Sequence, residues 1–170
     1  MNQYPLSQIG NIKNPKIIIL LANPGGDINN YKELPEYEMR NKYRDELMQF
    51  SIFRQYCTWW DELLKISDDY HINDSHICSL DYYPYHTKTS AYIPTKKHWD
   101  EYSLHRLQKN KALLSGFLKK KLPIFGYYWG HWLQETPELK TYPKFYQSKN
   151  GWKNSKRKEF RNFLDIYFHQ

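Results

Sequence analysis

The stretch IIILLANPGGD, residues 17–27, passes from an apolar run directly into an amide, a proline and two glycines. Asn23 has one acceptor and two donors, which suits it to hold a water molecule or a sugar. Gly25 and Gly26 let the main chain approach a ligand closely. Asp27 is suited to act as a base or to cap a turn. An ordinary strand-to-loop turn explains the same residues without any chemistry.

A second stretch rich in reactive groups is DYYPYHTKTS, residues 81–90. Asp81 and His86 are suited to acid–base catalysis or metal binding, but no further ligands at metal-site spacing accompany them. Asp81 and Tyr83 are alternatively suited to read the edge of a nucleobase and to stack on its face. The structural alternative is a tyrosine-rich loop whose hydroxyl groups find partners at the surface.

Several common kinds of site have no support in the sequence. There is no GxxxxGK[ST] or GxGxxG phosphate loop and no GxSxG nucleophile elbow. Two cysteines, Cys57 and Cys78, form neither a disulfide framework nor a zinc site.

The elements that must position these groups alternate between strand and helix. We predict strands at 16–22, 76–80 and 122–130, and helices at 43–67, 99–121, 131–136 and from 155 onward. Residues 1–15 read as a loose lead-in and 138–152 as irregular. This order predicts one α/β domain over residues 1–170 with a largely parallel sheet. In such sheets the ligand lies beyond the carboxyl ends of the strands, which here carry NPGGD, DYYPYH and YYWG.

The charge is concentrated near the C-terminus. Residues 140–161 contain eight cations and one acid, which accounts for the net charge of +7 of the whole chain. Aromatic side chains are interleaved with these cations, an arrangement typical of a surface that binds a polyanion with faces to stack on. A solvated helix face explains the same pattern.

Taken in order, these motifs resemble those of the uracil-DNA glycosylase superfamily. The NPG at Asn23, Pro24 and Gly25 is similar to the GxNPG motif of several branches, and Trp129-Gly130 is similar to the WG that ends a later strand. The resemblance runs from residue 16 to the C-terminus. It implies a three-layer α/β/α fold with a parallel four-stranded sheet, a flipped base, hydrolysis of the N-glycosidic bond, and no metal or cofactor.

The resemblance also implies roles for individual residues. Asn23 would orient or activate the water, and Tyr31 or Tyr37 would stack on the base. Asp81, in a position where the family commonly has Asn, would read the base edge. An ionised carboxylate only accepts hydrogen bonds, so a charged Asp81 would disfavour uracil, which presents O4 there, and favour an amino-bearing base. We therefore expect a modified cytosine or another altered base.

The late HPSP-like motif of the family is matched here by QSKNGWKNS, which lacks a histidine. Ser148, Lys149 and Asn150 would still contact the phosphate backbone, with Lys153 and Lys156 extending the cationic track. The role of steadying the departing base would then fall to His86 or His131.

The function expected from the sequence is that of a DNA glycosylase acting on single- or double-stranded DNA. One alternative is a catalytically silent module that binds nucleic acid, a nucleotide or a protein partner; another is a hydrolase of free nucleosides or nucleotides. The chain has no stretch of about 20 apolar residues that would span a membrane. Its N-terminus lacks the apolar run of a signal peptide, so we expect a cytoplasmic protein.

Overall fold

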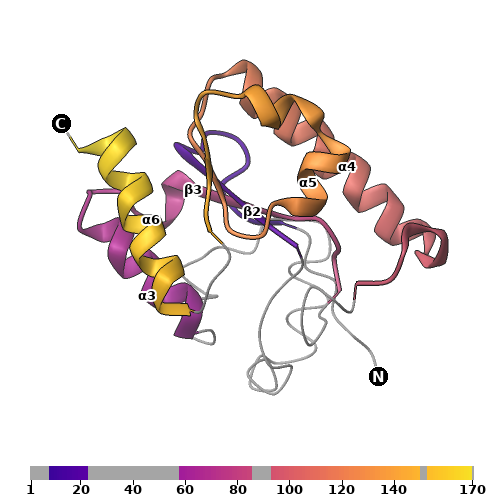
Figure 1. Cartoon of the computed structure of the whole chain (residues 1–170), viewed down its shortest axis with the longest axis horizontal. Helices are drawn as coiled ribbons and strands as arrows, with labels where there is room; N and C mark the ends of the chain where they lie inside the picture. Colours follow the sequence, from indigo (N-terminus) through magenta and orange to yellow (C-terminus); the bar gives the residue numbers. More distant parts are fainter. Residues whose placement is uncertain (1–7, 23–57, 86–92, 150–152, 170) are drawn as a thin grey trace.

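The computed structural model describes residues 8–22, 58–85, 93–149 and 153–169 of the chain (Figure 1). Within these ranges the side chains of residues 8, 58, 59 and 153–156 are not described. The described part contains five strands and four α-helices, together with the short 3-10 helices η2 (Asp74–His76), η4 (Lys96–His98) and η5 (Pro137–Thr141). The strands are β1 (Gln8–Gly10), β2 (Ile17–Leu21), β3 (Ile77–Asp81), β4 (Ile124–Gly126) and β5 (Phe145–Gln147). The α-helices are α3 (Thr58–Asp68), α4 (Glu101–Lys119), α5 (Gly130–Glu135) and α6 (Lys153–Phe168).

The strands form one mostly parallel sheet with β2 at its centre. Their order is β1-β3-β2-β4-β5, and only the β1–β3 pair is antiparallel. Leu21 lies opposite Asp81 on β3, and Leu20 lies opposite Gly126 on β4. All five residues of β2 are buried, as is typical of a parallel strand with both faces covered.

The two faces of the sheet carry separate hydrophobic clusters. Alternate residues of β2, namely Ile17, Ile19 and Leu21, pack with Trp60 and Leu63 of α3 and with apolar residues of α6. The intervening residues of β2 pack with α4 and α5 in the second cluster. Figure 1 shows the same arrangement, with α3 and α6 side by side and α4 and α5 away from them. Helices therefore cover both faces of β2.

Most elements predicted from the sequence are confirmed to within a few residues. Strand 16–22 corresponds to β2, strand 76–80 to β3, and the later helices to α4, α5 and α6. The predicted helix 43–67 is described only from residue 58, where α3 begins.

Four predictions about the sheet are wrong. Residues 1–15 contain the edge strand β1, residues 138–152 contain β5, and the sheet has five strands instead of four. Both missed strands have three residues, too few to show an alternating pattern, so neighbouring strands decide their conformation. The strand predicted to reach Gly130 ends at Gly126, and the amides of Tyr127 and Tyr128 both donate to the Leu20 carbonyl.

β5 and the turn after β4 both pack tightly against Gly126. A Cβ atom there would lie 2.8 Å from Cε2 of Phe145 and 2.8 Å from Cβ of Trp129. Trp129 also donates from Nε1 to the Ser148 carbonyl at 3.0 Å, which ties the turn after β4 to the turn after β5. At Gly130, by contrast, a Cβ would meet nothing within 4 Å.

We predict that Gly126→Ala lowers the free energy of unfolding by about 1–3 kcal/mol, because the added methyl group forces Trp129 or Phe145 out of place. Urea denaturation measures this loss. The control is Gly130→Ala, which should leave stability unchanged or raise it by up to about 1 kcal/mol, since alanine favours the helix. Equal losses for the two variants would contradict the packing argument.

Candidate functional site

The carboxyl ends of the four parallel strands lie at one edge of the sheet. After β2 the next described helix, α3, packs on one face, whereas α4 and α5, which follow the neighbouring strands β3 and β4, pack on the other. Ligands of α/β sheets bind beyond the carboxyl ends of the strands, where the helices that follow neighbouring strands pack on opposite faces. The candidate site is therefore the carboxyl edge around the end of β2.

Asp81, the last residue of β3, is the most unusual group at this edge. It is 1% exposed, and neither carboxylate oxygen has a hydrogen-bond partner among the described residues. Its main-chain carbonyl accepts a hydrogen bond of 2.9 Å from Nδ2 of Asn110 on α4, which fixes the end of the strand. A buried carboxyl group with no partner costs free energy, and burial raises the pKa of Asp81 well above its ordinary value.

The burial of Asp81 bears directly on the prediction that the protein discriminates against uracil. That prediction assumed an ionised Asp81, whereas burial favours the neutral acid. A neutral carboxyl group has one O–H donor and one C=O acceptor, the same pattern as the amide of an asparagine. A preference for an amino-bearing base therefore does not follow from Asp81 alone, and the choice of base stays a prediction.

The end of β2 beside Asp81 is held by several donors. The Leu21 carbonyl accepts the indole Nε1–H of Trp132 at 2.7 Å and the amide of Tyr82 at 3.0 Å. The Ala22 carbonyl accepts the amide of Tyr83 at 2.9 Å. The backbone that leads into the NPGGD motif is thus fixed by β3 and α5.

Tyr82 is the centre of an aromatic group on the α4 side of this edge. Its ring stacks on His131 with centroids 4.7 Å apart and planes 8° from parallel, and it meets Trp99 and Trp132 edge-on. Burial lowers the pKa of His131, which favours the neutral imidazole at physiological pH. Sequence reasoning gave His131 only a secondary role, because its partner Tyr82 is 49 positions away in the chain.

Tyr83, predicted to bind the base, packs in the same region. Its ring lies 4.8 Å from that of Trp99 and 5.6 Å from that of Tyr85 between centroids. Tyr85 in turn donates to Asp100, the residue that caps α4. In the described structure these tyrosines hold the loop against the start of α4, as the structural alternative proposed, and base contact by Tyr83 stays a prediction.

Tyr128 is an aromatic residue at this edge that the sequence did not single out. It follows β4, its amide donates to the Leu20 carbonyl of β2, and its side chain is 43% exposed. An exposed ring at this edge of the sheet offers a flat surface to a ligand. The sequence gave no signal for it, because YYW reads as a continuation of the buried strand until the end of β4 at Gly126 is known.

The prediction that the Ser148 side chain contacts phosphate needs correction. Ser148 is buried, and its hydroxyl lies 2.7 Å from the Gly126 carbonyl, to which it donates. The side chain therefore anchors the turn after β5 inside the protein. Lys149, the next residue, is exposed, which keeps it available for the predicted contact with a phosphate.

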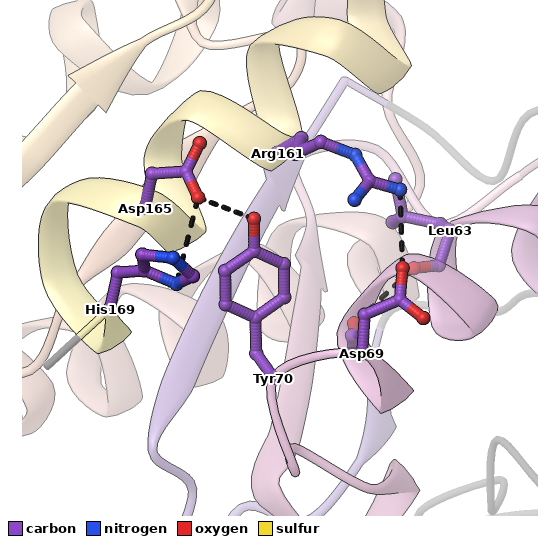
Figure 2. A network of polar contacts seen from close by, with 7 residues as sticks. Leu63, Asp69, Tyr70, Arg161, Asp165 and His169 are labelled. Atoms are coloured by element: carbon purple, nitrogen blue, oxygen red, sulfur yellow. Dashed lines mark hydrogen bonds and ion pairs between the residues drawn. The ribbon is translucent and has the colours of Figure 1, made fainter.

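Part of the C-terminal positive charge is neutralised within the fold. Arg157 pairs with Glu62 of α3, and Arg161 lies 3.2 Å from Asp69 just beyond that helix. Figure 2 shows Arg161 and Asp69 beside a second contact, in which Tyr70 donates to Asp165 at 2.5 Å. These contacts join α6 to α3 and its following turn. The positive charge available to a polyanion is therefore smaller than the formal charge of residues 140–161.

The remaining predicted site residues lie outside the described part of the chain. These are Asn23, Asp27, Tyr31, Tyr37, His86 and Asn150. Lys153 and Lys156 belong to α6, but their side chains are not described. Of the predicted residues, the structure places Asp81, Tyr83, Ser148 and Lys149 just at or beyond the carboxyl ends of β3 and β5, and it places His131 in α5, after β4.

Two other features are absent from the same ranges. No group of three or more His, Cys, Asp or Glu side chains there could hold a metal ion. No helix among the described residues has the length and apolar character needed to cross a membrane. Comparisons with protein-family models, with curated proteins and with solved structures give no match to this chain.

The raised pKa of Asp81 predicts how stability depends on pH. As pH rises from about 4, the unfolded state releases the Asp81 proton while the folded state retains it, so wild type loses up to about 1.4 kcal/mol per pH unit until the folded pKa is reached. Asp81→Asn removes this loss. We expect the stability advantage of Asp81→Asn over wild type, measured by urea denaturation, to grow by more than about 1 kcal/mol between pH 4.5 and 6.5.

Ser79→Ala is the matched control for this experiment. Ser79 is fully buried two residues earlier on β3, and its hydroxyl also has no partner in the described ranges, but it does not titrate. Its stability difference from wild type should be the same at both pH values. A constant difference for Asp81→Asn would show that Asp81 is ionised in the folded protein.

Proposed function

We propose that this protein is a DNA glycosylase that hydrolyses the N-glycosidic bond of a flipped base. The observation that carries the proposal is the buried carboxyl group of Asp81, which has no partner among the described residues and lies opposite Leu21 of β2 at the carboxyl edge of the sheet. The residue that follows Ala22 in the chain is Asn23, the predicted water-positioning residue. A base-reading group and a water-positioning group would then belong to neighbouring strand ends.

The arrangement of helices and strands supports this proposal. Helices pack on both faces of β2, and four neighbouring strands are parallel. We propose that they form the three-layer α/β/α arrangement of the uracil-DNA glycosylase superfamily, with β1 added as an antiparallel edge strand.

In the proposed reaction a water molecule attacks C1′ of the flipped nucleotide. A C1′–O bond forms, the C1′–N bond breaks, and its electron pair leaves with the base. Asn23 orients the water, with Asp27 as a candidate acceptor of its proton. Asp81 holds the base edge, and His86 stabilises the departing base. Tyr31 or Tyr37 stacks on the base, and no step requires a metal or another cofactor.

The substrate base is uracil or a modified base, including one derived from cytosine. A neutral Asp81 can donate to O4 of uracil, and it can equally accept from the amino group of a cytosine. Both substrate classes belong in the first assay.

The central test of the proposed function is the variant Asn23→Ala. We expect cleavage of oligonucleotides that contain uracil or a modified cytosine to be at least about 100-fold slower, a loss typical of a group that activates a reactant. Abasic product, revealed by alkaline strand scission, measures the rate. DNA affinity should change by less than about threefold, because phosphate contacts dominate it. Normal cleavage by Asn23→Ala would show that the role belongs to another residue.

The alternative is a binding module on the same fold without catalysis. The absence of a histidine from QSKNGWKNS favours it, since the departing base would then lack the group that this motif supplies in the family. Under this alternative no substrate yields abasic product, although binding to DNA persists and weakens with salt.

Either function requires a cationic track along residues 149–156. We expect that replacing Lys149, Lys153 and Lys156 with Gln reduces the slope of log affinity against log salt by about 2–3, because each phosphate that a lysine no longer neutralises lowers the slope by about 0.9. Fluorescence anisotropy of labelled DNA at several salt concentrations measures the slope.

A charge-matched control lies at the opposite end of the fold. Lys119, Lys120 and Lys121 are exposed at the end of α4, where the chain enters the amino end of β4. The corresponding triple Gln variant should retain the wild-type slope. Equal slopes for the two triple variants would mean that DNA is attracted by net charge alone, and a hydrolase of free nucleosides would be unaffected by either.

A further inference from the structure

Tyr128 is an exposed aromatic ring at the carboxyl edge of the sheet. Of the Phe, Tyr and Trp side chains that the structure describes, it is the most exposed, at 43%. The other described rings are buried or half-buried, and many of them belong to the two hydrophobic clusters. A single exposed ring is ordinary at a protein surface, so its surroundings decide whether it belongs to a site.

The ring of Tyr128 is held in place although it is exposed. The main-chain amide of Tyr128 donates to the Leu20 carbonyl at 3.1 Å. Its ring meets the ring of Tyr127 edge-on, with centroids 4.9 Å apart and planes at 69°. Tyr127 is buried and belongs to the cluster with α3 and α6. A ring that is fixed on a core residue loses little conformational freedom when a ligand binds, which strengthens binding.

The turn after β4 and the turn after β5 are bonded to each other on both sides of Tyr128. The Ser148 hydroxyl lies 3.2 Å from the carbonyl of Tyr127, and Trp129 donates from Nε1 to the Ser148 carbonyl at 3.0 Å. Both chain neighbours of Tyr128 therefore bond to the residue that precedes Lys149. An exposed ring and an exposed ammonium group thus extend from one connected pair of turns.

The main chain of Lys149 is fixed from the other side as well. Its amide donates to Oε2 of Glu159 on α6 at 3.4 Å, and the Tyr146 hydroxyl donates to the same oxygen at 3.0 Å. Glu159 therefore positions the turn after β5. The exposed side chain of Lys149 extends from a main chain that is held at both Ser148 and Glu159.

We propose that Tyr128 and Lys149 bind one unpaired nucleotide next to the flipped one, with the ring stacked on its base and the ammonium group paired with its phosphate. Single-stranded DNA is then the preferred substrate. This inference rests on the proposed function for the presence of DNA at this edge. It goes beyond that function by choosing single-stranded over double-stranded DNA.

The exposed ring favours a single strand over a duplex. Within a duplex the faces of the bases are covered by their neighbours, and a protein reaches the base edges and the phosphates. An unpaired base exposes its face, and stacking on aromatic side chains beside cations is typical of proteins that bind single strands. Side chains that part stacked base pairs are apolar, such as Phe, Leu and Met, whereas Tyr128 ends in a hydroxyl group.

The test measures the affinity of the full chain for a labelled oligonucleotide of the four ordinary bases, alone and annealed to its complement, by fluorescence anisotropy. We expect Tyr128→Ala to bind the single strand about 5- to 100-fold more weakly at every salt concentration, because the lost ring stacks on a base and carries no charge. Its affinity for the duplex should change by less than about twofold, since the base faces are covered there. Tyr128→Phe should bind both forms as wild type does.

Lys149 should show a different signature in the same assay. We expect Lys149→Gln to lower the slope of log affinity against log salt for the single strand by about 0.7, the value for one phosphate contact. The matched control is Lys144, which is exposed immediately before β5 and so lies at the opposite edge of the sheet. Lys144→Gln should keep the wild-type slope.

Two further controls separate stacking from other losses. Ile166→Ala removes an apolar side chain that is 61% exposed in the last turn of α6, and it should bind the single strand as wild type does. Inorganic polyphosphate has the charge of DNA without its bases, so wild type and Tyr128→Ala should bind it equally. Tyr128→Leu retains an apolar contact with Tyr127 but has no aromatic face, and it should lose as much single-strand affinity as Tyr128→Ala.

The unfolding midpoint of every variant is measured on the same preparations, and Tyr128→Leu decides the question if Tyr128→Ala does not fold. Unchanged single-strand affinity in the Tyr128 variants would overturn the proposal. Equal losses for the single strand and the duplex, or an equal loss in Ile166→Ala, would also overturn it.

The assay uses ordinary bases, so it separates this proposal from the glycosylase function. If Tyr128 and Lys149 give the expected pattern but no DNA yields abasic product, the nucleotide site stands and the glycosylase reaction is rejected. If DNA that contains uracil or a modified cytosine is cleaved but Tyr128→Ala binds the single strand as wild type does, the reaction stands and this site is rejected. No binding of wild type to either form of DNA would overturn both.

Discussion

The structure depends on the complete burial of β2. Its residues are between 0% and 4% exposed and are covered by two hydrophobic clusters, so no polar group can reach this strand from either face. Its carbonyls near the carboxyl end are occupied by neighbours: Leu20 accepts the amides of Tyr127 and Tyr128, and Leu21 accepts Tyr82 and Trp132. A ligand can therefore meet β2 only beyond its end, where the turns after β3, β4 and β5 also emerge. Burial of the central strand thereby determines where a site can form.

The sequence predicted the elements whose patterns are long or uniform. β2 is an uninterrupted apolar run, and α4 and α6 repeat their apolar residues at helical spacing, so local information was sufficient. It failed for β1 and β5, which are strands only because β3 and β4 offer them an unpaired edge. It also gave no indication that Gly126 is tightly packed, since the contact with Phe145 and Trp129 exists only after the sheet is assembled.

The sequence predicted the carboxyl edge of the sheet, where the candidate site lies, but it did not predict the electrostatics of the residues there. Counting charges along residues 140–161 could not reveal that Arg157 is paired with Glu62, 95 positions earlier in the chain. The expectation of an ionised Asp81 used the ordinary behaviour of an aspartate in water, and burial at the end of β3 reverses it. Ser148 was read as an exposed loop residue, but its hydroxyl bonds to the Gly126 carbonyl inside the fold. In each case the missing information was a tertiary contact.

The unpartnered carboxyl group of Asp81 departs from the ordinary rules of folding, and this departure indicates a functional role. A chain of 170 residues has a net stability on the order of 5–15 kcal/mol, so an unpartnered buried carboxyl that costs about 1–3 kcal/mol is a substantial part of it. An asparagine or an apolar residue would serve the sheet as well or better at the end of β3. Local violations of this kind are expected where function opposes stability. Asp81 has that character, and it lies at the carboxyl edge of the sheet, which the order of strands and helices independently indicates as the place for a ligand.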